Sequence, residues 1–208
     1  MSFLLPLLFG FFISFLAVIL PGLINMTGAK ISMQEGKNEA LSFALGASLV
    51  VFFQTFIAVL FARYINKHQQ IVTTLQEIGI FVFTGLSIYF FWIAKKPKKL
   101  NRSVKIKGKS NRFFFGVFLS LLNFLPIPFY VFASISLASL RYFSFEKTQI
   151  ISFVLGVVMG SFSVFYSYIV SFKLIQSKTD FLLRNSNNII GSVTTFMAII
   201  TIIKLFWS

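Results

Sequence analysis

Two apolar segments of the chain are interrupted by proline and carry side-chain amides beside the interruption. The first reads FGFFISFLAVILPGLIN over residues 9–25, and the second reads FGVFLSLLNFLPIPFY over residues 115–130. Proline removes a backbone N–H and clashes with the preceding helical turn, so each segment is predicted to break there. Within a bilayer, freed backbone groups are tolerated only inside protein or beside water. Such loose helix ends can bind a zwitterion or an ion.

The residues at these interruptions form the candidate substrate site. They are Pro21, Gly22 and Asn25 in the first segment, Asn123, Pro126 and Pro128 in the second, and Gln54 in the apolar segment between them. The alternative for each interruption is a simple kink or a helix end at the membrane surface. The recurrence of proline and asparagine in both segments favours a binding site. The alternative for the glutamine is a hydrogen bond to a neighbouring helix.

The composition predicts an all-α integral membrane protein. The chain is 57% hydrophobic and only 12% charged, with a mean hydropathy of +0.86. A membrane-spanning helix needs about 20 largely apolar residues. Six apolar segments meet this requirement, at residues 3–26, 39–63, 74–94, 113–138, 148–172 and 187–206. We therefore expect six transmembrane helices, with polar connectors such as residues 27–38 between them.

The two halves of the chain resemble each other, which predicts a repeat of three helices each over 1–94 and 113–208. Residues 9–16 match residues 115–122 at a shift of 106, and Ser42–Gly46 matches Ser152–Gly156 at a shift of 110. A repeat with an odd number of spans places its two copies in opposite orientations, as in many secondary transporters. Glycines at helical spacing in both halves predict close helix packing.

The basic linker 95–112 sets the expected topology. It carries nine Lys and Arg residues and no acid. Because positive loops stay in the cytoplasm, this linker is expected inside and both termini outside a plasma (inner) membrane, with attraction to anionic lipids. No aromatic residues are interleaved with the charges, so binding to nucleic acid is not expected. We expect Lys30, Glu35, Lys37 and Glu39 to form a solvated cytoplasmic turn.

The sequence offers little support for enzymatic or metal chemistry. Cysteine is absent, and the single histidine, His68, lies in a short polar turn. We expect no catalytic residues, no cofactor and no metal site, because no phosphate-binding, zinc-protease or triad motif is visible. Glu77 is the acid nearest to the interior of a span. It is a candidate for proton coupling, with an interfacial structural role as the alternative.

The quoted motifs resemble those of the lysine exporter (LysE/RhtB) family of amino-acid efflux proteins. The resemblance rests on Pro21–Asn25, on Glu35–Ala40, on Leu45–Ala47 and on Asn123–Pro128, and it extends over essentially the whole chain. The family's first motif has proline at the position of Leu23, and its second has proline at that of Phe124. The resemblance implies a six-span exporter of amino acids or related small zwitterions that works by alternating access.

Two other functions remain open from the sequence. Relatives in the same superfamily suggest a metal-cation exporter, although the chain lacks the thiolates and deep carboxylates that such cargo prefers. A non-transporting scaffold that binds lipid through 95–112 is the second alternative. The sequence also leaves open whether the chain forms a homo-oligomer.

Overall fold

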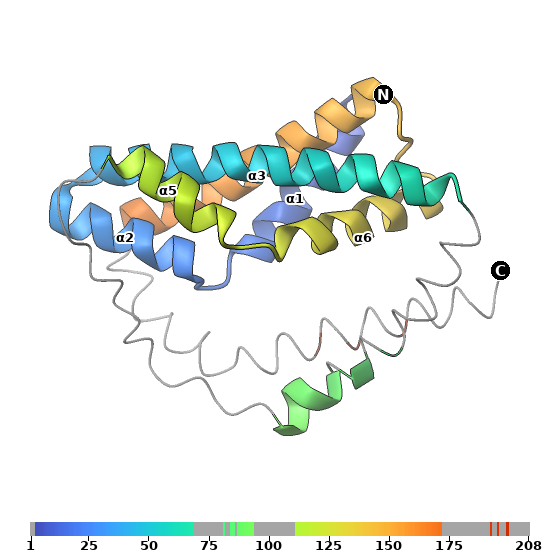
Figure 1. Ribbon diagram of the computed structural model, residues 1–208, viewed down its shortest axis with the longest axis horizontal. Helices are drawn as coiled ribbons and strands as arrows, with labels where there is room; N and C mark the ends of the chain where they lie inside the picture. Colours follow the sequence, from blue (N-terminus) through green and yellow to red (C-terminus); the bar gives the residue numbers. More distant parts are fainter. Residues whose placement is uncertain are drawn as a thin grey trace. The chain divides into compact units, whose positions relative to one another are not determined.

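A computed structural model describes residues 3–68, 81, 84–85, 87–93 and 111–171, together with the single positions 192, 195 and 199 (Figure 1). The regular structure that these residues form is helical. The chain divides into two compact units, Met1–Tyr64 with Ser103–Gln176, and Ile65–Arg102 with Ser177–Ser208. The second unit contains a short π-helix, η1, at Tyr89–Ile93. All candidate site residues except Glu77 belong to the first unit.

The first bent pair of helices consists of α1, Leu4–Val18, and α2, Leu23–Glu35, with an angle of 77° between them. The expected polar connector at 27–38 was therefore wrong, because α2 continues to Glu35. Its small and polar residues Asn25, Thr27, Gly28 and Ala29 are buried, so this part of the helix is sheltered by protein and does not need an apolar surface, whereas Met33–Glu35 are exposed. Gly36 ends it with a φ of 102°, a conformation that glycine adopts without strain.

Two long helices and a second bent pair complete the first unit. The helix α3, Lys37–Asn66, follows α2 directly, and a second long helix covers Lys147–Ser171. The second bent pair is α5, Arg112–Leu121, with α6, Pro126–Ser139, at an angle of 67°. Within the described residues, two helices are long and apolar enough to cross a membrane, or up to four spans result if each bent pair is one. The third and sixth expected spans fall largely outside the described residues.

The helix α1 packs closely on the long helix from the other half of the chain. A Cβ atom placed on Gly10 would lie within 3.0 Å of the carbonyl oxygen of Phe153. In return, a Cβ atom on Gly156 would lie within 3.0 Å of the carbonyl oxygen of Leu7. Glycine at both positions therefore lets the two backbones touch, as in close helix pairs of membrane proteins.

The helix α5 packs on α3 through the corresponding residues. Gly116 faces the carbonyl oxygen of Phe43, and Gly46 faces that of Phe113. These four residues are related to those of the first contact by the shifts of 106 and 110 that the sequence shows. The first helix of each bent pair thus contacts the long helix of the opposite half, and the two contacts use equivalent positions.

The two long helices run in opposite directions (Figure 1). Lys37 at the start of α3 donates to the hydroxyl of Tyr166 near the end of the other helix, with an Nζ–Oη distance of 3.2 Å. Opposite directions are what two inverted copies produce. The six-span repeat and its division at 95–112 stay predictions, because too little of the third span of each half is described.

Candidate functional site

The first break lies between α1 and α2 and contains Pro21 and Gly22. Gly22 is the N-cap of α2, with extended backbone, and it has no side chain to cap the helix. Gly22 and the following Leu23 are exposed, whereas Asn25 in the same first turn is buried. The interruption seen in the sequence is therefore a true break between two helices, and the start of α2 is accessible.

The carbonyl groups at this break are hydrogen-bonded within the protein. The Nδ2 group of Asn25 donates to the carbonyl oxygens of Val18 at 2.7 Å and Leu20 at 3.0 Å. The hydroxyl of Tyr168, on the opposite half's long helix, donates to the carbonyl oxygen of Ile19 at 2.9 Å. These contacts satisfy acceptors that would be costly if left unpaired inside a membrane. The carbonyl end of α1 is thus occupied by side chains.

At the second break, the carbonyl groups are hydrogen-bonded by Gln54. Its Nε2 group donates to the carbonyl oxygens of Asn123 at 2.8 Å and Ser120 at 3.3 Å. The structure therefore brings Gln54 together with Asn123, through the backbone of Asn123. The hydrogen bond between helices that the sequence left as an alternative for this glutamine is present.

The start of α6 differs from the start of α2 in its backbone donors. Pro126 and Pro128 lie in its first turn and have no N–H group. Ile127, between the two prolines, donates its N–H to a carbonyl of the preceding turn at 3.2 Å. Phe129, directly after Pro128, does so at 3.4 Å. The prolines that mark this break in the sequence thus remove donors from it.

Each of the two amides keeps one buried group without a partner. Among the described residues, Oδ1 of Asn25 and Oε1 of Gln54 accept no hydrogen bond. The two residues are only 4% and 6% exposed. Of the two ends of a side-chain amide, only the NH₂ group can donate to a carbonyl. The contacts at the breaks therefore determine which way each amide points. A buried acceptor without a partner costs about 1–3 kcal/mol, so each oxygen would gain from a hydrogen-bond donor.

One apolar cluster borders both breaks. Val18 and Ile24, which flank the first break, pack against a buried group that includes Ala47 and Leu119. Leu119 lies directly before Ser120, whose carbonyl accepts from Gln54. The two breaks are therefore connected through one continuous apolar interior of the first unit.

A buried hydroxyl network was missed by sequence reasoning. The Oγ atoms of Ser14 and Ser161 lie 2.6 Å apart, and the hydroxyl of Tyr130 donates to Ser14 at 3.1 Å. These residues connect α1, α6 and the second long helix. The repeat offered a partial signal, because Ser14 matches Ser120, but nothing in the sequence identified its partners. Such a satisfied network fixes the arrangement of the helices around the site.

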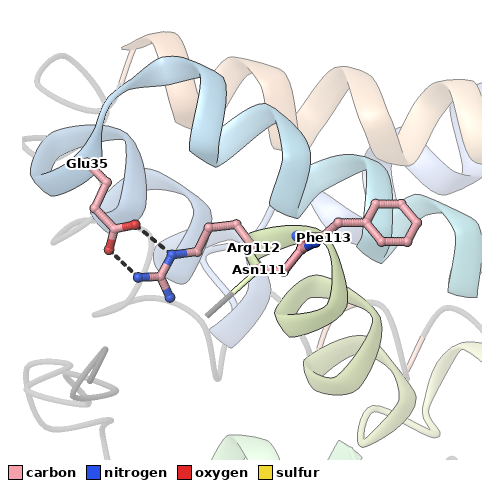
Figure 2. A network of polar contacts seen from close by, with 4 residues as sticks. All are labelled: Glu35, Asn111, Arg112 and Phe113. Atoms are coloured by element: carbon pink, nitrogen blue, oxygen red, sulfur yellow. Dashed lines mark hydrogen bonds and ion pairs between the residues drawn. The ribbon is translucent and has the colours of Figure 1, made fainter. Parts of the chain in front are cut away.

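An ion pair joins the end of α2 to the start of α5, as Figure 2 shows. Nε and Nη2 of Arg112 each donate to one carboxylate oxygen of Glu35, at 2.6 Å in both cases. The side chain of Arg112 is 6% exposed and that of Glu35 is 27% exposed. The expectation that Glu35 belongs to a solvated turn was wrong, because α2 carries it to a buried arginine. Asn111 accepts a hydrogen bond from the backbone of Phe113 and caps α5.

Other sequence predictions stay untested. Glu77 lies outside the described residues, as does most of the basic linker 95–112. Within the part of the chain that the structure describes, no group of three or more His, Asp or Glu side chains could hold a metal ion. The roles of the seven candidate substrate-site residues also stay predictions.

We expect Gln54→Leu to lower the free energy of unfolding by about 1–2 kcal/mol. The variant leaves two backbone carbonyl groups at the second break without the amide that donates to them. Thr55→Val is the matched control on the next residue. The Thr55 hydroxyl is buried without a hydrogen-bond partner among the described residues, so its loss is expected to be neutral or stabilising. Thermal unfolding of the purified protein in detergent compares the two. Equal midpoints for both variants would contradict the role assigned to Gln54.

The chain matches a known protein family. The family model described as LysE type translocator matches residues 11–205 of the chain. This range contains the second bent pair, both long helices and all of the first bent pair except Leu4–Gly10 of α1. Neither the curated proteins nor the solved structures contain a match to the chain.

Proposed function

Because the chain belongs to the LysE type translocator family, and so is a membrane transport protein, we propose that it exports amino acids or related small zwitterions by alternating access. One observation carries the proposal: two broken helices border the same apolar cluster, and each break holds a buried amide with a free oxygen. Broken helices in corresponding positions of two repeats are where transporters bind substrate.

The described packing supports a rocking motion between the repeats. Each bent pair contacts the opposite half's long helix through glycine, so that backbone meets backbone at the points of closest approach. Backbone surfaces of this kind can slide over each other more readily than interdigitated side chains. In the proposed cycle the bent pairs move on the long helices and expose the breaks first to one membrane face and then to the other.

The chemistry of the breaks favours a zwitterion over a metal cation. Their polar groups are amides, hydroxyls and backbone groups, whereas transition metals prefer thiolate and imidazole ligands. Amide oxygens and backbone N–H groups match an ammonium and a carboxylate. No catalytic residue is proposed, since the family's function is translocation.

The proposed function is tested by release of amino acids from preloaded cells. We expect the double variant Asn25→Ala/Asn123→Ala to release amino acids about fivefold to tenfold more slowly than the unaltered protein, because one hydrogen bond is worth about 1 kcal/mol. Asn38→Ala is the matched control, an exposed asparagine in the first turn of α3. Equal release by both forms, at equal amounts in the membrane and across all amino acids, would refute the proposal.

A further inference from the structure

The two breaks look alike in the sequence but offer different backbone chemistry. The first N–H groups of a helix have no carbonyl partner within that helix. In α2 these belong to Leu23, Ile24 and Asn25, and the N-cap Gly22 supplies no side-chain cap. The next N–H, of Met26, is already bonded to the carbonyl of Gly22 at 3.0 Å. The start of α2 therefore presents up to three N–H groups beside an exposed glycine.

The start of α6 presents no comparable set. Two of its four first positions are proline, and the other two N–H groups donate to carbonyls of the preceding turn. A helix N-terminus attracts anions through its N–H groups and its dipole. Only the first break can therefore bind a carboxylate through the backbone.

The same break also holds a hydrogen-bond acceptor, on the side chain of Asn25. Asn25 lies in the first turn of α2 and is 4% exposed, and its Oδ1 atom has no hydrogen-bond partner among the described residues. Its Nδ2 group holds the carbonyls of Val18 and Leu20, so the amide cannot turn to satisfy its oxygen. An acceptor without a partner therefore belongs to the same helical turn as the N–H donors, and donor and acceptor together are what an α-amino acid requires.

We propose that the N-terminus of α2 binds the carboxylate of a neutral amino acid and that Oδ1 of Asn25 accepts from its ammonium group. This inference rests on the proposed export function and deepens it. The second break, with its prolines and with Gln54, then contributes an acceptor, Oε1, but no site for the carboxylate.

The preference for a neutral side chain follows from the charges of the first unit. No Asp, Glu, Lys, Arg or His occurs in residues 4–29 or 113–140, which contain the two breaks. Of the charged residues that the structure describes, Arg112 alone is buried, and Glu35 pairs with it. Among the residues that the structure describes, the segments that form the breaks offer a charged substrate side chain no partner, and burying an unpaired charge is strongly unfavourable.

The test uses full-length protein in proteoliposomes that exchange radiolabelled L-leucine. Competitors are L-leucine, 3-methylbutylamine, which lacks the carboxylate, and 4-methylpentanoate, which lacks the ammonium group. Leu23→Pro removes one N–H at the first helical position, where proline is well tolerated. Leu23→Ala is its matched comparison, because it loses the side chain but keeps the N–H. The extended backbone of Gly22 suits a following proline.

Leucine should compete at least about tenfold better than either analogue, since a hydrogen bond to a charged group is worth about 1.5–3 kcal/mol. Relative to Leu23→Ala, Leu23→Pro should weaken competition by leucine about tenfold and leave competition by 3-methylbutylamine unchanged. Should Leu23→Pro fail to fold, the analogue series on the unaltered protein decides, because competition by 3-methylbutylamine equal to that by leucine refutes the carboxylate subsite.

The outcomes separate the subsite from the export function. Equal leucine affinity in Leu23→Pro and Leu23→Ala would overturn the subsite and leave export standing. Exchange of L-lysine or L-glutamate without exchange of L-leucine would overturn the neutral class. If none of these three amino acids is exchanged by the unaltered protein, the proposed export function itself is wrong.

Discussion

Replacing Gly46 or Gly116 by alanine is expected to lower the free energy of unfolding by about 3 kcal/mol or more. The added Cβ would lie within 3.0 Å of a facing carbonyl oxygen in both cases. That neighbour is backbone within a helix, so it cannot turn aside as a side chain would. The helices α3 and α5 must separate, which also disturbs the hydrogen bonds that Gln54 makes at the second break.

Thermal unfolding in detergent, monitored by the fraction that remains monodisperse, measures this effect. Gly28→Ala is the matched control, because its Cβ would meet only the side chains of Phe43 and Ile169, at ordinary distances of 3.5 and 3.8 Å. Alanine also favours helix over glycine by about 1 kcal/mol, so the control should be neutral or more stable. If Gly46→Ala and Gly28→Ala unfold at the same temperature, the close backbone contact does not exist in the membrane protein.

The second large effect concerns the ion pair, and its two partners should not behave alike. Glu35→Gln removes the carboxylate that accepts two hydrogen bonds from the buried guanidinium of Arg112, and we expect a loss of about 3 kcal/mol. Arg112→Met leaves Glu35, whose side chain is 27% exposed and can be hydrated. We therefore expect a smaller loss, of about 1 kcal/mol. The unfolding midpoints of the two variants should differ in this order.

The double variant Glu35→Gln/Arg112→Met tests whether the two residues act on each other. It removes both charges, so it should be more stable than Glu35→Gln alone. Glu39→Gln serves as a control, because this acid is exposed in the first turn of α3. Additive losses in the double variant, or a loss in Glu39→Gln as large as that in Glu35→Gln, would contradict the pairing.

The breaks were predictable because their cause is local. Pro21 and Pro126 each interrupt an apolar run, and the structure bends by 77° and 67° at those points. Family membership was also predictable from short motifs around these prolines, and the family match confirms it. The glycines that bring the helices together repeat at constant shifts, so one sequence was enough to indicate them.

The partners across the structure were not predictable, because packing between distant helices decides them. Tyr168 is 149 residues away from the carbonyl of Ile19 that it caps, and Glu35 is 77 residues away from Arg112. The extent of α2 was missed for a related reason. Hydropathy identifies helices with largely apolar surfaces, whereas α2 buries small and polar side chains in its first two turns and ends in exposed residues.

The crossed contacts also constrain how the chain reaches its final form. While the first half is being synthesised, Gly10 and Gly46 have no partner, because the Lys147–Ser171 helix and α5 do not yet exist. The helix faces that carry these two glycines therefore stay unpaired until the later helices are inserted.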